Sequence, residues 1–168
     1  MKKYKISMLG AFAVGKTSLV RQYVFSIFSG SYQTTLGVKI DKKSLEVDGE
    51  TVELILWDLA GEDDFMKVPG SYLRGSAGVV LVADGTRADT LETAMGLNQK
   101  VIDEVGNVPV ILLVNKSDVK GSWTIDQVEL RRMQDSGWRI IETSAMDGAN
   151  VNQAYQEMAQ QLIGRGQS

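Results

Sequence analysis

Near its N-terminus the chain carries Gly10-Ala11-Phe12-Ala13-Val14-Gly15-Lys16-Thr17, a complete match to the pattern G-x-x-x-x-G-K-[ST]. Tyr4–Leu9, just before the motif, has the composition of a strand, and the apolar residues after it recur at helical spacing over Leu19–Ile27. A glycine-rich loop between a strand and a helix lets backbone N–H groups converge on phosphate oxygens, and the helix N-terminus adds positive potential. We therefore predict that Gly10–Ser18 binds phosphate. The other interpretation is an ordinary glycine-rich turn.

Short apolar runs alternate with helical periodicities along the rest of the chain. Val38–Val47 and Thr51–Trp57 flank Asp48-Gly49, a dipeptide typical of tight hairpin turns. Val79–Ala83 and Val108–Val114 are continuously apolar, as expected of strands covered on both faces. We predict one α/β domain over residues 1–168, with a six-stranded, mostly parallel sheet, one antiparallel edge strand and helices on both faces. The remaining predicted elements are a strand at Trp138–Glu142 and helices at Ala94–Val105, Ile125–Gln134 and Val151–Leu162.

The composition excludes several kinds of chemistry. The 168 residues contain no Cys and no His, which excludes disulfides, thiolate nucleophiles, Cys/His zinc sites and histidine bases. Lipid attachment by prenylation or palmitoylation also needs Cys. Eighteen basic and 21 acidic residues give a net charge of −3, which argues against nucleic-acid binding. Apolar runs are too short for a secretory signal or a membrane span, so we expect a cytoplasmic chain without a lipid anchor.

The loops that follow four of the predicted strands carry side chains or backbone amides suited to binding a ligand. In an open α/β sheet, ligands bind beyond the carboxyl ends of the strands, so the loops after Leu9, Trp57, Val114 and Glu142 should share one edge. Lys16 would neutralise phosphate charge, and the Thr17 hydroxyl would bind Mg²⁺. In Trp57-Asp58-Leu59-Ala60-Gly61-Glu62, Asp58 would reach the same metal and the Gly61 N–H would approach a γ-phosphate. Taken alone, D-x-x-G is also typical of an ordinary turn.

A third loop, Asn115-Lys116-Ser117-Asp118, directly follows the run that ends at Val114. A carboxylate that accepts two parallel N–H bonds from guanine would discriminate against adenine, which lacks that pair of donors. The competing interpretation is a polar turn with an Asx cap. The last loop, Glu142-Thr143-Ser144-Ala145, offers backbone N–H groups where a base carbonyl could lie.

Together, GxxxxGKT, a Thr-Thr segment, WDxAGE, NKSD and ETSA resemble the small Ras-superfamily GTPases, nearest to the Rab group, over essentially the whole chain. The resemblance implies a P-loop NTPase small G domain, a monomeric GTPase that binds GTP or GDP with Mg²⁺ and acts as a molecular switch. Ser29–Gly37 and Leu59–Tyr72 would reorder when the γ-phosphate leaves and would bind effectors and regulators. The C-terminal Gly164–Ser168 has no Cys, which suggests a prokaryotic Rab-like protein or a shortened chain.

The resemblance also assigns roles to single residues. Phe28 would pack edge-on against the base, although a core aromatic is the alternative, and Tyr32 would cover the phosphates. Asn115 and Asp118 would read guanine, with the stem of Lys116 along the base. The implied metal ligands are Thr17, Thr35 and Asp58, and the implied catalytic set is Lys16, Thr35, Gly61 and Glu62. The implied nucleotide contacts are Gly10, Ala11, Phe12, Ala13, Val14, Gly15, Lys16, Thr17, Ser18, Phe28, Tyr32, Thr35, Gly61, Asn115, Lys116, Asp118, Ser144, Ala145 and Met146.

Three residues depart from the family pattern. Glu62 replaces the glutamine that orients the attacking water in the phosphoryl-transfer scheme of this family. A carboxylate there repels the developing phosphoryl charge by about 3 kcal/mol at about 5 Å and an effective dielectric of about 20, which predicts slow hydrolysis. A raised pKa that makes Glu62 a base or donor is the alternative. Phe12 replaces a glycine of Ras proteins and should crowd an inserted arginine, and Met146 replaces a lysine.

Two rival functions remain open on the sequence alone. One is an interaction module that holds GTP or GDP with negligible hydrolysis, as Glu62 and Phe12 would allow. The other is a P-loop kinase that uses ATP, against which Asn115–Asp118 argues. Four apolar residues near the second segment would form an exposed patch in one nucleotide state only, or else part of the core: Met66, Val68, Tyr72 and Leu73.

Overall fold

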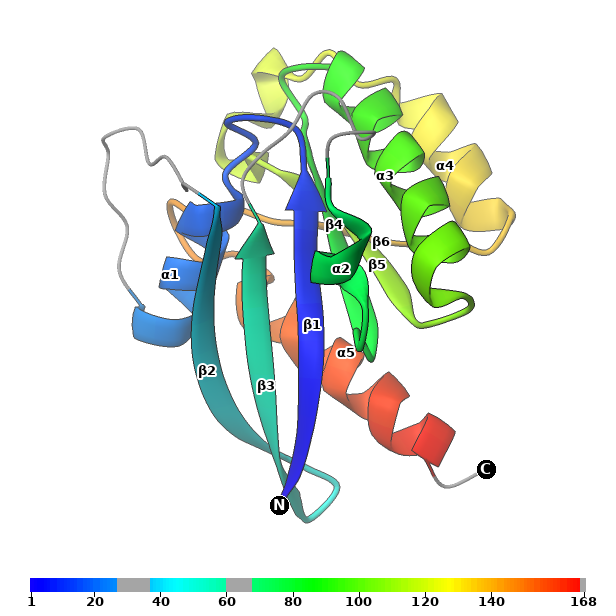
Figure 1. Ribbon diagram of the computed structural model, residues 1–168. Helices are drawn as coiled ribbons and strands as arrows, with labels where there is room; N and C mark the ends of the chain where they lie inside the picture. Colours follow the sequence, from blue (N-terminus) through cyan, green and yellow to red (C-terminus); the bar gives the residue numbers. More distant parts are fainter. Residues whose placement is uncertain (27–36, 60–67, 167–168) are drawn as a thin grey trace.

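The computed structural model describes residues 1–26, 37–59 and 68–166. These residues form one sheet with the strand order β2-β3-β1-β4-β5-β6 (Figure 1). Only the edge pair β2–β3 is antiparallel among the paired strands, which confirms the predicted sheet. The strands are β1 (Lys2–Gly10), β2 (Val38–Val47), β3 (Glu50–Leu59), β4 (Gly78–Asp84), β5 (Val110–Asn115) and β6 (Arg139–Glu142).

Helices cover both faces of this sheet, as predicted. One core cluster joins α1 and α5 to residues such as Ile6 and Met8, and the other joins α2, α3 and α4 to residues such as Leu9. The alternation along β1 follows from the two-residue period of a strand. The structure has helices α1 (Lys16–Phe25), α2 (Gly70–Leu73), α3 (Asp89–Val105), α4 (Gln127–Asp135) and α5 (Val151–Gly166), and the 3₁₀ helix η2 (Ser117–Ser122).

The strand register brings the carboxyl ends of five strands to one edge. Met8 lies beside Asp58, Gly10 beside Val82, Asp84 beside Asn115 and Val114 beside Glu142. The carboxyl ends of β1, β3, β5 and β6 therefore share the edge that the sequence predicted for them, and the end of β4 lies there too; residues 60–67, which follow β3, lie outside the described residues. β4 can be entirely buried because helices cover it on both sides.

Several boundaries differ from the prediction. β5 begins at Val110 rather than Val108, because Pro109 has no N–H to contribute to a ladder. α3 begins at Asp89, five residues before the apolar periodicity becomes visible. The short helix α2 was not predicted, and its last carbonyls are held by Lys5, whose Nζ donates to the carbonyl oxygens of Tyr72 and Arg74 at 2.7 Å each. Ile27, predicted to continue the face of α1, lies outside the described residues.

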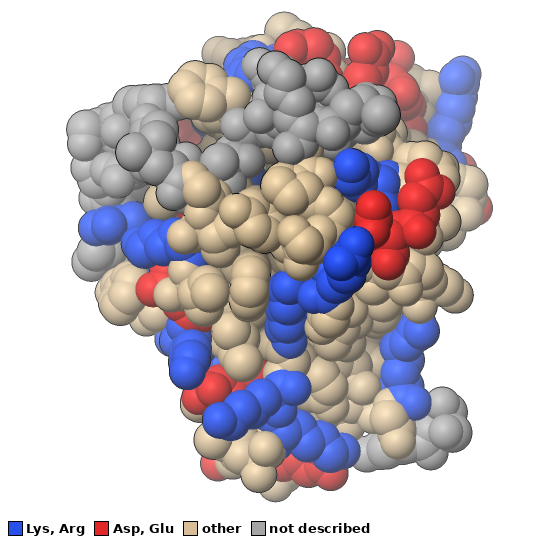
Figure 2. Space-filling view, in the orientation of Figure 1, with Lys and Arg blue, Asp and Glu red and all other residues tan. Residues whose placement is uncertain are grey.

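Surface charge is mixed on the face seen in Figure 2. Lys and Arg side chains lie over the lower part of β1–β3, with Asp and Glu side chains among them. Within the described part of the chain, no helix is both long and apolar enough to cross a membrane.

Candidate nucleotide-binding site

The loop between β1 and α1 has the backbone of an anion-binding turn. Ala13 and Gly15 have positive φ angles of 62° and 98°, and α1 begins at Lys16 without a side-chain cap on its first N–H groups. Uncapped N–H groups at a helix N-terminus attract anions. Within the described residues, the N–H groups of Ala13 and Gly15 donate no hydrogen bond to another protein atom.

Both glycines of the loop are required by close packing. A Cβ on Gly10 would lie 2.6 Å from the carbonyl oxygen of Val82, and a Cβ on Gly15 would lie 2.3 Å from Nδ2 of Asn115. The loop therefore packs against β4 and against the end of β5. Only a residue without a side chain fits at these two positions.

Lys16 supplies a buried positive charge beside the loop. Its side chain is 5% exposed, and burial lowers the pKa of its ammonium group while the nearby Asp58 carboxylate partly opposes this change. The Lys16 Nζ lies 3.9 Å from Oδ1 of Asp58, longer than a hydrogen bond. A buried ammonium group whose nearest carboxylate lies beyond hydrogen-bond distance is stabilised by an additional anion nearby.

The predicted metal ligands of the described region lie together. The Thr17 hydroxyl donates to Oδ2 of Asp58 at 2.6 Å, and Asp58 is fully buried. Hydroxyl and carboxylate oxygens fit Mg²⁺, which is held by one or two protein ligands together with substrate phosphates. The described ranges contain no cluster of three or more acidic side chains that could hold a metal by themselves.

The Asn115 side chain, at the end of β5, forms hydrogen bonds with the loops after β1 and β6. Its Nδ2 donates to the carbonyl oxygen of Val14 at 3.0 Å, and its Oδ1 accepts from the Thr143 hydroxyl and the Ala145 N–H, each at 3.3 Å. Asn115 is 2% exposed, so these contacts are shielded from water. One amide side chain at the end of β5 thus joins the loop between β1 and α1, the predicted phosphate loop, to the loop after β6.

The carboxylate of Asp118 lies at the mouth of this arrangement. It is exposed in the first turn of η2, and the buried Ser144 hydroxyl donates to its Oδ1 at 2.9 Å. The Ser144 hydroxyl also accepts from the N–H of Asp147 at 3.2 Å. A fixed, solvent-facing carboxylate beside the Ala145 amide can accept paired hydrogen bonds from a planar base.

These motifs and their geometry agree with a comparison of the whole chain. A model of the Ras family matches residues 5–164. The chain belongs to the Ras family. It is accordingly a small P-loop GTPase, a GTP-binding switch protein whose family binds GTP or GDP, typically with Mg²⁺.

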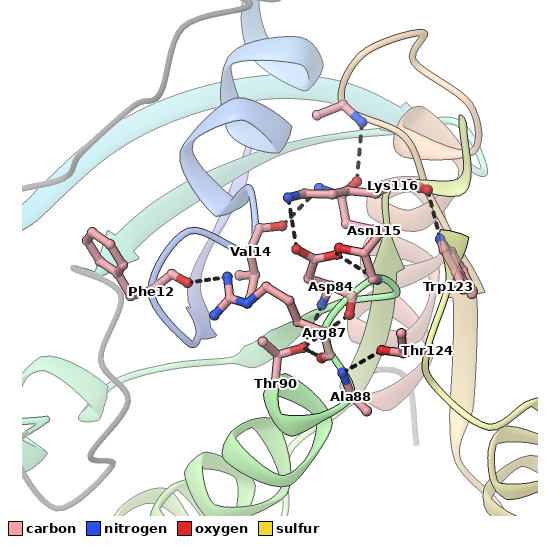
Figure 3. Close-up of polar contacts among 12 residues, drawn as sticks. Phe12, Val14, Asp84, Arg87, Ala88, Thr90, Asn115, Lys116, Trp123 and Thr124 are labelled. Atoms are coloured by element: carbon pink, nitrogen blue, oxygen red, sulfur yellow. Dashed lines mark hydrogen bonds and ion pairs between the residues drawn. The ribbon is translucent and has the colours of Figure 1, made fainter. Parts of the chain in front are cut away.

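In this Ras-family chain the loop after β4 adds residues that the sequence did not single out. Asp84 is fully buried, and its Oδ2 forms an ion pair with Nζ of Lys116 at 2.8 Å (Figure 3). Its Oδ1 accepts from the N–H and the hydroxyl of Thr86 at 2.8 and 2.7 Å. The carbonyl of Lys116, whose φ is 74°, accepts from Nε1 of Trp123 at 2.8 Å. The signal available in the sequence was an acidic residue directly after the apolar run Val79–Ala83.

A second contact from the same loop reaches the phosphate loop. Nη1 of Arg87 donates to the carbonyl oxygen of Phe12 at 2.8 Å (Figure 3). The Phe12 side chain is 47% exposed and Met146 is 60% exposed, so both lie at the rim of the site.

The remaining predicted residues of this Ras-family chain divide into two groups. Ser18 lies in the first turn of α1, and Ser144 and Ala145 are buried beside Asn115. For the apolar patch, the core interpretation holds for Val68 and Leu73, which are buried, whereas Tyr72 is exposed. The following predicted residues and segments lie wholly or partly outside the described residues: Phe28, Tyr32, Thr35, Gly61, Glu62, Met66, Ser29–Gly37 and Leu59–Tyr72.

Proposed function

We propose that the chain is a Rab-like guanine-nucleotide switch, a single G domain over residues 1–168. Gly10–Ser18 would hold the phosphates, and the loops after β5 and β6 would hold the base. The observation that carries this proposal is the Asn115 side chain, which bonds at once to the Val14 carbonyl and to the Ala145 N–H. In the proposed site this contact would hold the phosphate-binding loop and the base-binding loop next to each other, as a nucleotide ligand requires.

Guanine selectivity is assigned to the exposed carboxylate of Asp118. Its contact with Ser144 leaves acceptor capacity for paired N–H groups on the base, which adenine does not present. The Ala145 N–H, which donates to Oδ1 of Asn115 at 3.3 Å, would share this bond with the base carbonyl, and Met146 would pack at the rim. The stem of Lys116 would lie along the base, held by the ion pair of its ammonium group with Asp84.

The proposed metal ligands are Thr17 and Asp58, with Thr35 as the third. Bound Mg²⁺ would neutralise charge on the β- and γ-phosphate oxygens. Lys16 would contribute a desolvated positive charge to the same phosphates, because its side chain is buried and its Nζ lies 3.9 Å from the Asp58 carboxylate, beyond hydrogen-bond distance. Gly61 would offer its N–H to the γ-phosphate, while Phe28 and Tyr32 would cover the base and the phosphates.

Hydrolysis is proposed to be slow because Glu62 replaces the water-orienting glutamine. The test is the single-turnover rate of GTP hydrolysis in the native chain and in Glu62→Gln. Repulsion of about 3 kcal/mol would correspond to about a hundredfold gain in the variant, of which we expect at least tenfold. A rate that is unchanged or lower in the variant would reject this explanation and favour Glu62 as a base.

The alternative function, an interaction module with negligible hydrolysis, is supported by the half-exposed Phe12 at the rim of the loop. Phosphate release over hours, with and without candidate activating proteins, separates the two functions. Steady release supports a hydrolase, and no release under either condition supports the module.

Effectors and regulators are proposed to bind through Ser29–Gly37 and Leu59–Tyr72. Exposed apolar side chains support this surface: Tyr72 is 37% exposed, and Ile40, which pairs with Trp57 across β2–β3, is 48% exposed. The mixed charge on this side of the sheet gives no support to a nucleic-acid partner (Figure 2). We propose that the protein works in the cytoplasm.

Binding of a fluorescent GDP derivative tests the nucleotide assignment directly. We expect unlabelled GDP and GTP to displace the probe, and a hundredfold excess of ATP to leave it bound. Displacement by ATP with similar potency would contradict the role of Asp118 and restore the kinase interpretation.

A further inference from the structure

The loop after β4 holds the phosphate loop from outside through Arg87. The hydrogen bond from Nη1 of Arg87 ends on the carbonyl oxygen of Phe12, a residue 75 positions away in the sequence. Because a trans peptide is planar, the carbonyl of Phe12 and the N–H of Ala13 point in opposite directions. The N–H of Ala13 therefore points away from Arg87.

This N–H is one of the loop donors with no acceptor among the described protein atoms. Ala13 has a φ of 62°, a conformation that a residue with a side chain adopts only when its surroundings hold it there. A cation bonded to the preceding carbonyl polarises the peptide and strengthens its N–H as a donor. The contact thus both orients and activates the amide.

The Asn115 side chain holds the Val14–Gly15 peptide in the way that Arg87 holds the Phe12–Ala13 peptide. Its Nδ2 bonds to the carbonyl oxygen of Val14, so the N–H of Gly15 points to the opposite side. Two alternate peptides of the loop are therefore fixed from behind by side chains of neighbouring loops.

Both backbone polar groups of Arg87 are hydrogen-bonded within the loop after β4. Its N–H donates to the carbonyl oxygen of Asp84 at 3.0 Å, and its carbonyl accepts from the N–H and hydroxyl of the buried Thr90 at 3.0 and 2.7 Å. Asp84 is in turn paired with Lys116. Through Asp84, Arg87 is therefore linked to Lys116 in the proposed base-binding loop (Figure 3).

We propose that Arg87 is a positioning residue for phosphate binding, which holds the Ala13 amide toward the bound nucleotide through the Phe12 carbonyl. This inference rests on the proposed nucleotide site. We expect Arg87 to strengthen the binding of GDP and GTP alike. The Ala13 amide lies in the loop between β1 and α1, and not in a segment that responds to the terminal phosphate.

The test compares Arg87→Met, which keeps the length of the stem but has no donor, with Arg87→Lys, which keeps a charged donor. Arg131→Met is the matched control, because Arg131 is an exposed arginine on α4. The readouts are the release rates of fluorescent GDP and of a fluorescent non-hydrolysable GTP analogue, and the ¹H–¹⁵N signal of Ala13 in the GDP-bound protein.

We expect Arg87→Met to release both nucleotides about tenfold faster, the order expected for one hydrogen bond to a charged group. Its Ala13 amide signal should move, Arg87→Lys should release nucleotide at an intermediate rate, and Arg131→Met should match the native chain. Moderately faster release without any change at Ala13 would count against the proposal, because a general loosening of the fold produces that result.

Three further results would overturn the proposal. The first is that Arg87→Met and Arg131→Met release nucleotide at the same rate. The second is that Arg87→Lys releases nucleotide as fast as Arg87→Met. The third is that only release of the GTP analogue becomes faster. If Arg87→Met does not fold, Arg87→Lys decides alone, and an unchanged Ala13 signal with native release rejects the inference. A native chain that never binds the GDP probe would instead reject the proposed function.

Discussion

Replacing Asp84 by asparagine tests whether the buried ion pair with Lys116 stabilises the edge of the sheet. The variant keeps the shape of the side chain, and its carbonyl oxygen can still accept from Thr86. The other side-chain atom becomes an NH₂ group facing the Lys116 ammonium group, so two donors would meet where the structure has an ion pair of 2.8 Å. Asp84 is fully buried, so water does not reach the substituted side chain itself.

Removing one partner of a fully buried pair costs about 3–5 kcal/mol. The Lys116 side chain is 39% exposed, so solvent screening reduces this loss and we expect about 2 kcal/mol for Asp84→Asn. In a chain of this size, that loss lowers Tm by about 4–8 °C. Because bound nucleotide raises Tm, both proteins must be melted in the same excess of GDP.

Glu157→Gln is the matched control for this measurement. Glu157 pairs with Arg139, and both of these side chains contact solvent, so the pair should contribute less than about 1 kcal/mol at neutral pH. A melting temperature for Asp84→Asn within about 1 °C of the native value, or a smaller loss than in Glu157→Gln, would refute the structural role of Asp84.

Two other predictions follow from local geometry and charge. Gly15→Ala places a methyl group 2.3 Å from Asn115 Nδ2 at a φ of 98°, and should weaken GDP binding at least tenfold in a fluorescence titration. Gly75→Ala, with a φ of 81° but open space, should bind GDP normally, and equal losses would contradict the packing argument. Hydrogen bonds from Arg139 lower the pKa of Glu157 from 4.5, so its stabilising contribution is complete above that pH and is lost as pH falls through the lower folded-state pKa. The difference in urea midpoint between the native chain and Glu157→Gln should therefore vanish in acid, and a constant difference would contradict it.

The sequence predicted those parts of the site whose residues stand close together in a recognisable spacing. Gly10–Thr17 and Asn115–Asp118 each occupy one loop, and the alternation of strands and helices places both loops at the same edge. The contacts that hold these loops could not be predicted in the same way. Arg87 meets Phe12 across 75 residues, and Asn115 meets Val14 across 101.

The missed elements have physical reasons of their own. α2 spans only four residues and has no visible periodicity, and its carbonyls depend on Lys5 from β1. η2 has no buried residue, so no apolar pattern marks it. Asp84 follows the predicted strand Val79–Ala83 and so resembles a loop residue in the sequence, whereas in the structure it is the last residue of the buried strand β4 and lies beside Asn115.

The account rests centrally on a guanine nucleotide held between the phosphate loop and the loops after β5 and β6. Mass spectrometry of the nucleotide released from freshly purified protein tests this most directly. We predict GTP or GDP at close to one equivalent per chain, with GTP in excess if hydrolysis is as slow as Glu62 suggests. An adenine nucleotide, or protein that contains no nucleotide and does not bind added GDP, would contradict the account.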